Sequence, residues 1–232
     1  MTQNAPTPPR EPIFNISERA PVVLGAVFIA VHVVATYGPL FLQNIIAMWG
    51  LLMSPDMAAQ INDLPAGRAY TSLILHGFLH GSWAHALVNT AMMVPFGVVT
   101  IKGAKLRAAQ KGRSARGEGT FLFVFFAGVI IGGAGQLLYW KISGEPGSAL
   151  GASGGVSALF ACGAWAMGGR PQLLKFAGAW LLINIVMIFA GEVMTGGAGV
   201  AWASHLAGFA AGAVLGPLLV RANSTGFRAV QN

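Results

Sequence analysis

The sequence predicts an all-α membrane protein, a bundle of six transmembrane helices with an interfacial first loop. Hydrophobic residues make up 55% of the 232 residues and charged residues only 9%, whereas soluble domains carry about 25% charge. Six apolar stretches each have close to the ~20 residues that a helix needs to cross ~30 Å of hydrocarbon. Basic residues also gather in the segments that would lie on one side of the membrane.

The six predicted spans divide the chain into three parts. The spans are residues 21–37, 81–101, 120–140, 153–169, 173–191 and 201–220. Residues 1–20 form a flexible cytoplasmic N-terminal segment, 21–221 the six-helix domain, and 222–232 a cytoplasmic C-terminal tail. Because residues 1–20 are polar and rich in proline, they lack the apolar core of a signal peptide, and we expect them to be retained.

The connection between the first and second spans, residues 38–80, begins with a stretch too apolar for a solvated loop. We expect this stretch to lie in the outer membrane interface, partly helical, with Trp49 at headgroup level. Alternatively, residues 38–54 extend the first helix. Gly38 and Pro39 favour a break instead.

The basic residues are distributed asymmetrically. If residues 102–116, which hold six of them, are cytoplasmic, then 12 of the 14 Lys and Arg residues lie on the cytoplasmic side, and only Arg68 and Lys141 lie outside. This pattern predicts that both termini are cytoplasmic. The net charge of +7 is therefore interpreted as a topology signal beside lipid, and no nucleic-acid partner is expected. The absence of an organelle presequence favours a bacterial inner membrane.

Glycines recur four residues apart in the third and sixth predicted spans. They are Gly128 and Gly132, and then Gly208, Gly212 and Gly216. Such rows let helix backbones approach closely in membranes. We expect the sixth span to pack tightly against a neighbour.

Strongly polar residues lie near the outer ends of spans two, four and six. They are His85, Asn89, Ser153 and His205. Such groups are costly inside a bilayer and usually serve a function. At 1.5 Å per residue they lie roughly 0–12 Å below the outer boundary, so we expect them to meet in one shallow cavity that opens outward.

These four residues have the chemistry of a hydrolase site. His85 and Asn89, spaced i and i+4, share one helix face and can both donate to a single oxygen. Ser153 lies at a loop-to-helix junction, where it supplies a nucleophile and an unpaired backbone N–H for an oxyanion hole. His205 is the expected general base. Because the membrane portions of these spans contain no Asp or Glu, a dyad is favoured over a triad.

Other interpretations apply to some of these residues and to their neighbours. Ser153, taken alone, can bond the carbonyl one turn back, and His32 is expected to be a hydrogen-bonded interior residue. His76 and His80 have the spacing of metal ligands but lack the accompanying glutamate, so no metal or cofactor is expected. Residues 151–155 also match the G-x-S-x-G elbow of α/β hydrolases, which requires a preceding strand that this sequence does not predict.

The ordered set of motifs resembles that of rhomboid intramembrane serine proteases, over about residues 21–220. The matching pieces are His80-Gly81-Ser82-Trp83 followed by His85-x-x-x-Asn89, then Gly151-Ala152-Ser153-Gly154, then His205-x-x-Gly208-x-x-x-Gly212. The resemblance implies that Ser153 is the nucleophile and His205 the general base. It implies an oxyanion hole formed by His85, Asn89 and the Ser153 backbone amide. It also implies an interfacial first loop and a substrate gate at span five and the loop after it.

Three positions depart from the family pattern. Arg68 follows Gly67, where many members have Trp-Arg. Ser157 stands where many members have an aromatic residue that stacks under the catalytic histidine, so His205 needs another support. Ser204 replaces the usual alanine before that histidine, a minor change.

The sequence therefore predicts a membrane protease that cleaves single-span membrane proteins near the outer face through an acyl-enzyme on Ser153. Its expected partners are transmembrane protein substrates and the lipid bilayer, and the sequence predicts no oligomeric state. One alternative is a non-catalytic relative that binds membrane helices. Another is a small-solute channel or transporter, which the lack of mid-span acidic residues and of an inverted repeat disfavours.

Overall fold

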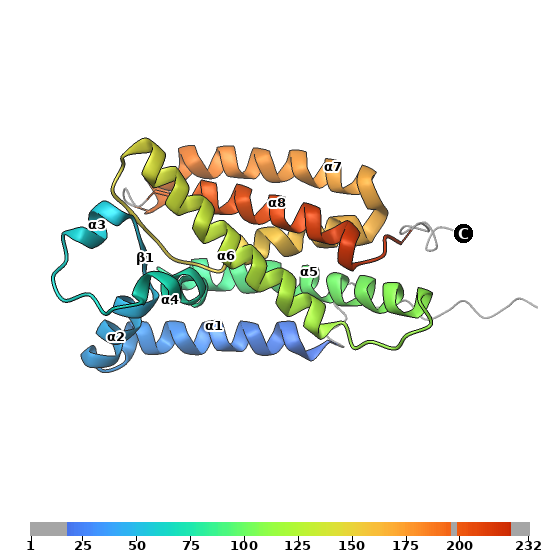
Figure 1. Cartoon of the computed structure of the whole chain (residues 1–232), viewed down its shortest axis with the longest axis horizontal. Coiled ribbons are helices and arrows are strands. Elements are labelled where there is room, and N and C mark those ends of the chain that lie inside the picture. The colour runs from blue at the N-terminus through green and yellow to red at the C-terminus, as the bar shows by residue number, and fades with distance from the viewer. Residues whose placement is uncertain (1–17, 196–198, 224–232) are drawn as a thin grey trace, which may run out of the picture.

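The computed structural model describes residues 18–195 and 199–223, which are mostly helical (Figure 1). The long helices are α1 (Arg19–Tyr37), α5 (Trp83–Gln110), α6 (Glu118–Ser143), α7 (Ser153–Thr195) and α8 (Trp202–Leu219). The short elements are α2 (Leu40–Gly50), β1 (Leu52–Met53), α3 (Pro55–Ala59), α4 (Arg68–Leu75), the 3-10 helix η1 (His76–Phe78) and β2 (Ser148–Ala149). Of the predicted terminal segments 1–20 and 222–232, all but residues 18–20 and 222–223 lie outside the described residues.

Five helices in the described part of the chain are long and apolar enough to cross a membrane, whereas the sequence predicted six spans. The difference lies in α7, which contains both predicted spans 153–169 and 173–191. Its backbone is not helical at Gly168 and Gly169, and Figure 1 shows the chain turning back on itself within α7. Gly169 has a φ of +67°, a conformation that favours glycine.

Helix α5 is longer than the predicted second span and continues to Gln110. The segment 102–116, predicted as a basic loop, is therefore helical over its first nine residues, and that part of the prediction is wrong. Residues 102–110 are rich in Ala, Lys, Leu, Arg and Gln, which are strong helix formers. Their charges end the apolar span, but they do not end the helix.

The connection after α1 is folded and does not continue the first helix. Helix α1 ends at Tyr37, Gly38 is extended, and α2 begins at Leu40, so the predicted break is confirmed. Strand β1 then pairs antiparallel with β2, Leu52 opposite Ala149. Two-residue strands carry too little periodicity for a sequence to predict them. This ladder ties the first loop to the segment that precedes Ser153.

Arg68 links two helices of the first loop, residues 38–80, through hydrogen bonds of its side chain. Its side chain is buried, and its Nε donates to the carbonyl oxygen of Met48 at 2.9 Å while Nη2 donates to that of Leu51. Carbonyls at the end of a helix lack intrahelical partners. The guanidinium therefore satisfies the C-terminal end of α2 and fixes α4 against it.

The first half of α7, residues 153–167, lies at the centre of the bundle and packs against α5, α6 and α8. Glycines of α8 make the closest approach to it. A Cβ at Gly208 would overlap the carbonyl oxygen of Gly154, and a Cβ at Gly212 would overlap that of Ala158. The predicted tight packing of the last span is confirmed.

The second half of α7 has a different character. Across residues 171–189, most side chains are exposed, and many are large and apolar, as suits a surface against lipid. Two side chains in this stretch are buried, Trp180 and Asn184. Spaced i and i+4, they occupy one helix face, which therefore faces the bundle.

Candidate active site

The N-terminal ends of three helices lie at the same end of the bundle and carry predicted site residues. His85 is the third residue of α5, Ser153 the first of α7 and His205 the fourth of α8. The Oγ of Ser82 caps α5 by accepting the backbone N–H of His85 at 3.1 Å. The Oε1 of Gln136 accepts a backbone N–H in the first turn of α8 at 3.3 Å. Side chains thus contribute hydrogen bonds at the N-terminal ends of two of these helices.

The structure brings Ser153 and His205 together. The Oγ of Ser153 lies 2.8 Å from the Nε2 of His205. The histidine is buried, with 5% of its surface exposed. This is the separation that a nucleophile and its general base require, although their chemical roles stay predictions.

Asn184, which sequence reasoning missed, forms the other contact of the histidine. The Nδ1 of His205 lies 2.8 Å from the Oδ1 of Asn184, and the Nδ2 of Asn184 donates to the carbonyl oxygen of Trp180 at 2.9 Å. The available signal was a strongly polar residue within an apolar span. Asn184 is not acidic and lies in the fifth predicted span, so the lack of Asp and Glu in spans two, four and six did not point to it.

His85 lies against the turn that leads into Ser153. Gly151 in this turn has a φ of +123°, and its N–H donates to the carbonyl oxygen of His76 at 2.8 Å. A Cβ at Gly151 would lie 2.7 Å from the His85 Nε2. Conformation and contact both require glycine here, and together they place the imidazole of His85 beside the turn that leads into Ser153.

Asn89 is buried one helical turn farther along α5, and its Nδ2 donates to the carbonyl oxygen of His85 at 3.0 Å. Because an amide nitrogen carries two protons, one N–H is left for another acceptor. The structure therefore keeps His85 and Asn89 adjacent. Their function as oxyanion donors stays a prediction.

The position of the expected aromatic residue is used differently here. The Oγ of Ser157 donates to the carbonyl oxygen of Ser153 at 2.6 Å. The ring near His205 is that of Trp180, with centroids 6.2 Å apart, and Trp180 packs on Phe160 at 4.8 Å. The support that His205 was expected to need therefore comes from the second half of α7.

Three other histidines, His32, His76 and His80, are buried near this end of the bundle. His32 is buried, and its Nδ1 donates to the carbonyl oxygen of His80 at 3.0 Å, which confirms it as a hydrogen-bonded interior residue. Burial, with a smaller effect from nearby His85, lowers the pKa of His80 to about 4, so its ring is neutral at pH 7. His76 donates from Nδ1 to the carbonyl oxygen of Ser72 at 2.8 Å. The described residues contain no group of three or more His, Cys, Asp or Glu placed to hold a metal.

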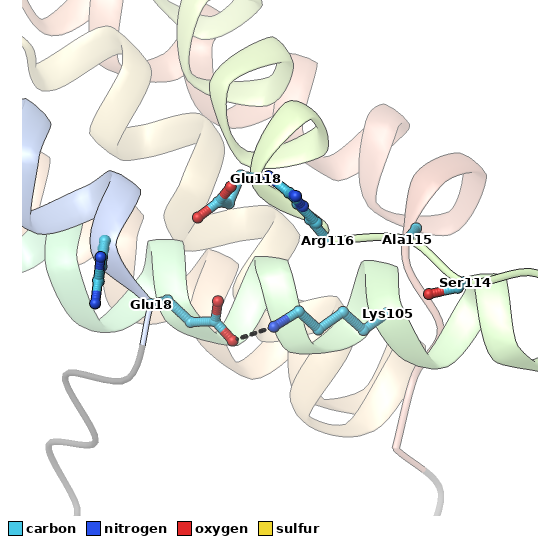
Figure 2. Close-up of a pocket in the computed structure, with 7 residues that line it drawn as sticks. Glu18, Lys105, Ser114, Ala115, Arg116 and Glu118 are labelled. Atoms are coloured by element: carbon cyan, nitrogen blue, oxygen red, sulfur yellow. Dashed lines mark hydrogen bonds and ion pairs between the residues drawn. The ribbon is translucent and has the colours of Figure 1, made fainter.

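A cavity of about 490 Å³ lies elsewhere, where α1 begins and the loop between α5 and α6 passes (Figure 2). Its lining consists of Glu18, Arg19, Lys105, Ser114, Ala115, Arg116 and Glu118. The Nζ of Lys105 pairs with Glu18 at 2.6 Å. Lys105 follows His85 by twenty residues of α5, which is roughly 30 Å of helix. This charged cavity is therefore separate from the Ser153 site.

Comparison with known families identifies the class of this protein. A family model described as the Rhomboid domain matches residues 67–222, about two thirds of the chain. The chain belongs to the rhomboid family. The match spans α4 to α8 and includes every predicted site residue. Among curated proteins, no match is found.

Membership of this family and the apolar helices together make the protein an integral membrane protein. Members of the family are mostly intramembrane serine proteases, although some are not catalytic. The membership thus suggests an intramembrane protease.

Proposed function

We propose that the protein is an intramembrane serine endopeptidase that cleaves single-span membrane proteins near the outer face of the membrane. Ser153 is the nucleophile and His205 the general base. The observation that carries the proposal is the 2.8 Å separation of the Ser153 Oγ and the His205 Nε2. The pair lies inside a bundle of apolar helices, where such polar groups usually serve function.

The proposed reaction passes through an acyl-enzyme. The Oγ of Ser153 attacks the carbonyl carbon of the scissile peptide bond while its proton moves to the Nε2 of His205. The Ser153 backbone N–H, His85 and Asn89 donate hydrogen bonds to the resulting oxyanion. The C–N bond then breaks as His205 protonates the leaving amine, and water hydrolyses the ester by the same steps.

The proposed topology has six spans, with residues 153–169 and 173–191 on either side of Gly168 and Gly169. With both termini cytoplasmic, the beginnings of α5, α7 and α8 face the outer side, so cleavage occurs there. The proposed location is a bacterial inner membrane. Peptide hydrolysis needs an extended substrate, so we expect substrates with helix-weakening residues near the scissile bond, where unwinding costs least.

The proposal is tested with purified protein in proteoliposomes and a single-span reporter substrate. Ser153→Ala and His205→Ala are each expected to lower cleavage by at least about 10³-fold, because both residues act in the same step. Ser114→Ala removes a serine hydroxyl beside the Lys105 cavity and is expected to leave cleavage unchanged. Undiminished cleavage by Ser153→Ala would refute the assignment.

Fluorophosphonate labelling separates the enzyme from a non-catalytic relative. Such a reagent modifies an activated serine, so wild-type protein is expected to be labelled and Ser153→Ala is not. A protein that binds the reporter helix but neither cleaves it nor reacts with the reagent would instead be a helix-binding member of the family.

A further inference from the structure

We propose that Asn184 is a positioning residue for His205. In this proposal Asn184 holds the imidazole in the tautomer whose Nε2 can accept the proton of Ser153, so that three residues act together where the sequence predicted a dyad. The inference rests on the proposed protease function. It adds to that function a residue from the second half of α7.

The orientation of the Asn184 amide follows from its other partner. A backbone carbonyl can only accept a hydrogen bond, so the group that faces the carbonyl oxygen of Trp180 at 2.9 Å must be the amide nitrogen. The Oδ1 is then the atom that faces His205, at 2.8 Å from Nδ1. Because Oδ1 can only accept, Nδ1 must carry the proton.

This fixes the tautomer of the catalytic ring. A neutral imidazole has one protonated nitrogen and one bare nitrogen, and the hydrogen bond of one decides the state of the other. With Nδ1 protonated, the bare Nε2 faces the Ser153 hydroxyl at 2.8 Å. The opposite tautomer would direct an N–H at that hydroxyl, and it could not remove the proton.

The placement of Asn184 argues against a role in packing alone. Its side chain is 2% exposed, although the residues around it on the helix face outward with apolar side chains. An amide buried in apolar surroundings is costly unless its polar atoms are bonded. Both ends of this amide are bonded, one of them to His205. A leucine of similar size would fill the same space without that cost.

Asn184 is also the side chain that restrains His205 on the face opposite Ser153. Ser157, at the position where an aromatic ring was expected, bonds the backbone of its own helix. Trp180 approaches the imidazole with its ring but at a centroid distance of 6.2 Å and a tilt of 48°, which is not stacking. The hydrogen bond that the His205 Nδ1 donates to Asn184 therefore sets the rotation of the imidazole.

Two substitutions of similar size separate positioning from packing. Asn184→Leu fills the space but cannot accept a hydrogen bond, and it is expected to lower kcat about 10- to 100-fold while KM changes less than about 3-fold. This expected loss of kcat is a part of the rate acceleration of about 10²–10⁴-fold that general-base catalysis supplies. Asn184→Asp keeps the acceptor and is expected to retain most of kcat. A residue that only packs would give the opposite order, because Asp buries a charge and Leu does not.

Thr100→Val is the matched control, since it replaces another buried polar side chain by a similar shape on α5, and it is expected to leave kcat unchanged. Thermal unfolding confirms that each variant is folded before its activity is compared. If Asn184→Leu does not fold, Asn184→Ala replaces it, with the same expected loss of kcat. If Asn184→Asp does not fold, the tautomer measurement decides.

The tautomer is read directly from the ¹⁵N chemical shifts of the His205 ring in labelled protein, independently of activity. Wild-type protein is expected to show a protonated Nδ1 and a bare Nε2, and Asn184→Leu a mixture of tautomers. Wild-type kcat and an unchanged tautomer in a folded Asn184→Leu would overturn the inference. A wild-type protein that neither cleaves the reporter nor reacts with a fluorophosphonate would contradict the protease function itself, which is a different result.

Discussion

At the scale of single residues, His85 and Asn89 make different contacts near Ser153. The His85 ring lies against Gly151, two residues before the nucleophile. The Asn89 amide donates one N–H to the backbone of its own helix and keeps one for another acceptor. Catalytic hydrogen bonds often tighten only when substrate is bound, and the proposed mechanism has both side chains donate to the oxyanion at that stage.

Loss of either proposed oxyanion donor is expected to affect kcat more than KM. Asn89→Asp keeps the size of the side chain but replaces the donor by an acceptor, and we expect it and His85→Ala to lower kcat by about 10²–10³-fold, the usual cost of one such donor. Steady-state cleavage of the reporter in proteoliposomes measures this. Val88→Ala alters an outward-facing neighbour and serves as control. A rise in KM at constant kcat would show instead that these residues bind the substrate.

The residues that could be predicted were those whose type is conspicuous in a membrane helix. Ser153 and His205 stood out because each lies at the beginning of an apolar span, and the structure brings them together. Asn184 was missed because its importance depends on the turn at Gly168 and Gly169, which returns the chain to the nucleophile. A sequence shows a polar residue in a span, but not the face that it occupies.

At the scale of elements, the first half of α7 and α8 approach each other most closely where two glycines of α8 meet the backbone of α7. Gly208 and Gly212 lie directly against carbonyl groups of the first half of α7. Such rows of small residues allow close packing in membranes. This contact sets the position of His205 relative to Ser153, because the two residues lie on these two helices.

Adding one methyl group at this contact is expected to destabilise the protein. Gly208→Ala would place a Cβ against the Gly154 carbonyl, and overpacking of this kind costs about 1–3 kcal/mol. The measurement is the thermal unfolding midpoint in detergent. Gly178→Ala, where a Cβ would meet nothing within 4 Å, is expected to leave the midpoint unchanged or raise it slightly, since Ala favours helix by about 1 kcal/mol. Equal midpoints for the two variants would contradict close packing at Gly208.

The helices could be predicted from apolar periodicity and length, but their ends could not. The second span was predicted to end where the charges begin, yet α5 continues to Gln110. Hydropathy indicates which residues can lie in hydrocarbon, but a helix of good helix formers can continue beyond the membrane. The β1–β2 ladder joins residues about a hundred positions apart. Neither strand has a local signature, so only the fold could reveal the pair.

At the scale of the whole molecule, the two ends of the bundle differ in chemistry. The Ser153 site lies where α5, α7 and α8 begin, among side chains that are buried or partly buried. The other end of α5 leads into the basic segment and the charged cavity of Figure 2. Such an excess of basic residues at one side is the usual mark of the cytoplasmic face.

The orientation is tested by labelling introduced cysteines in intact cells with a membrane-impermeant maleimide. Asp56→Cys, at the beginning of α3, is expected to react from outside, whereas Arg113→Cys, in the loop after α5, is expected to react only after the membrane is opened. Both positions are exposed, and the native Cys162 is buried, so background labelling is low. Labelling of Arg113→Cys in intact cells would reverse the proposed orientation.

The reversal within α7 also limits how this chain can change in length. Ser153 and Asn184 approach the same imidazole from two arms joined at Gly168 and Gly169. A residue inserted into the second arm would rotate everything after it by about 100° around the helix axis, which would turn the amide towards lipid. We therefore expect insertions to be tolerated in the loop between α5 and α6, but not between the bend and position 184.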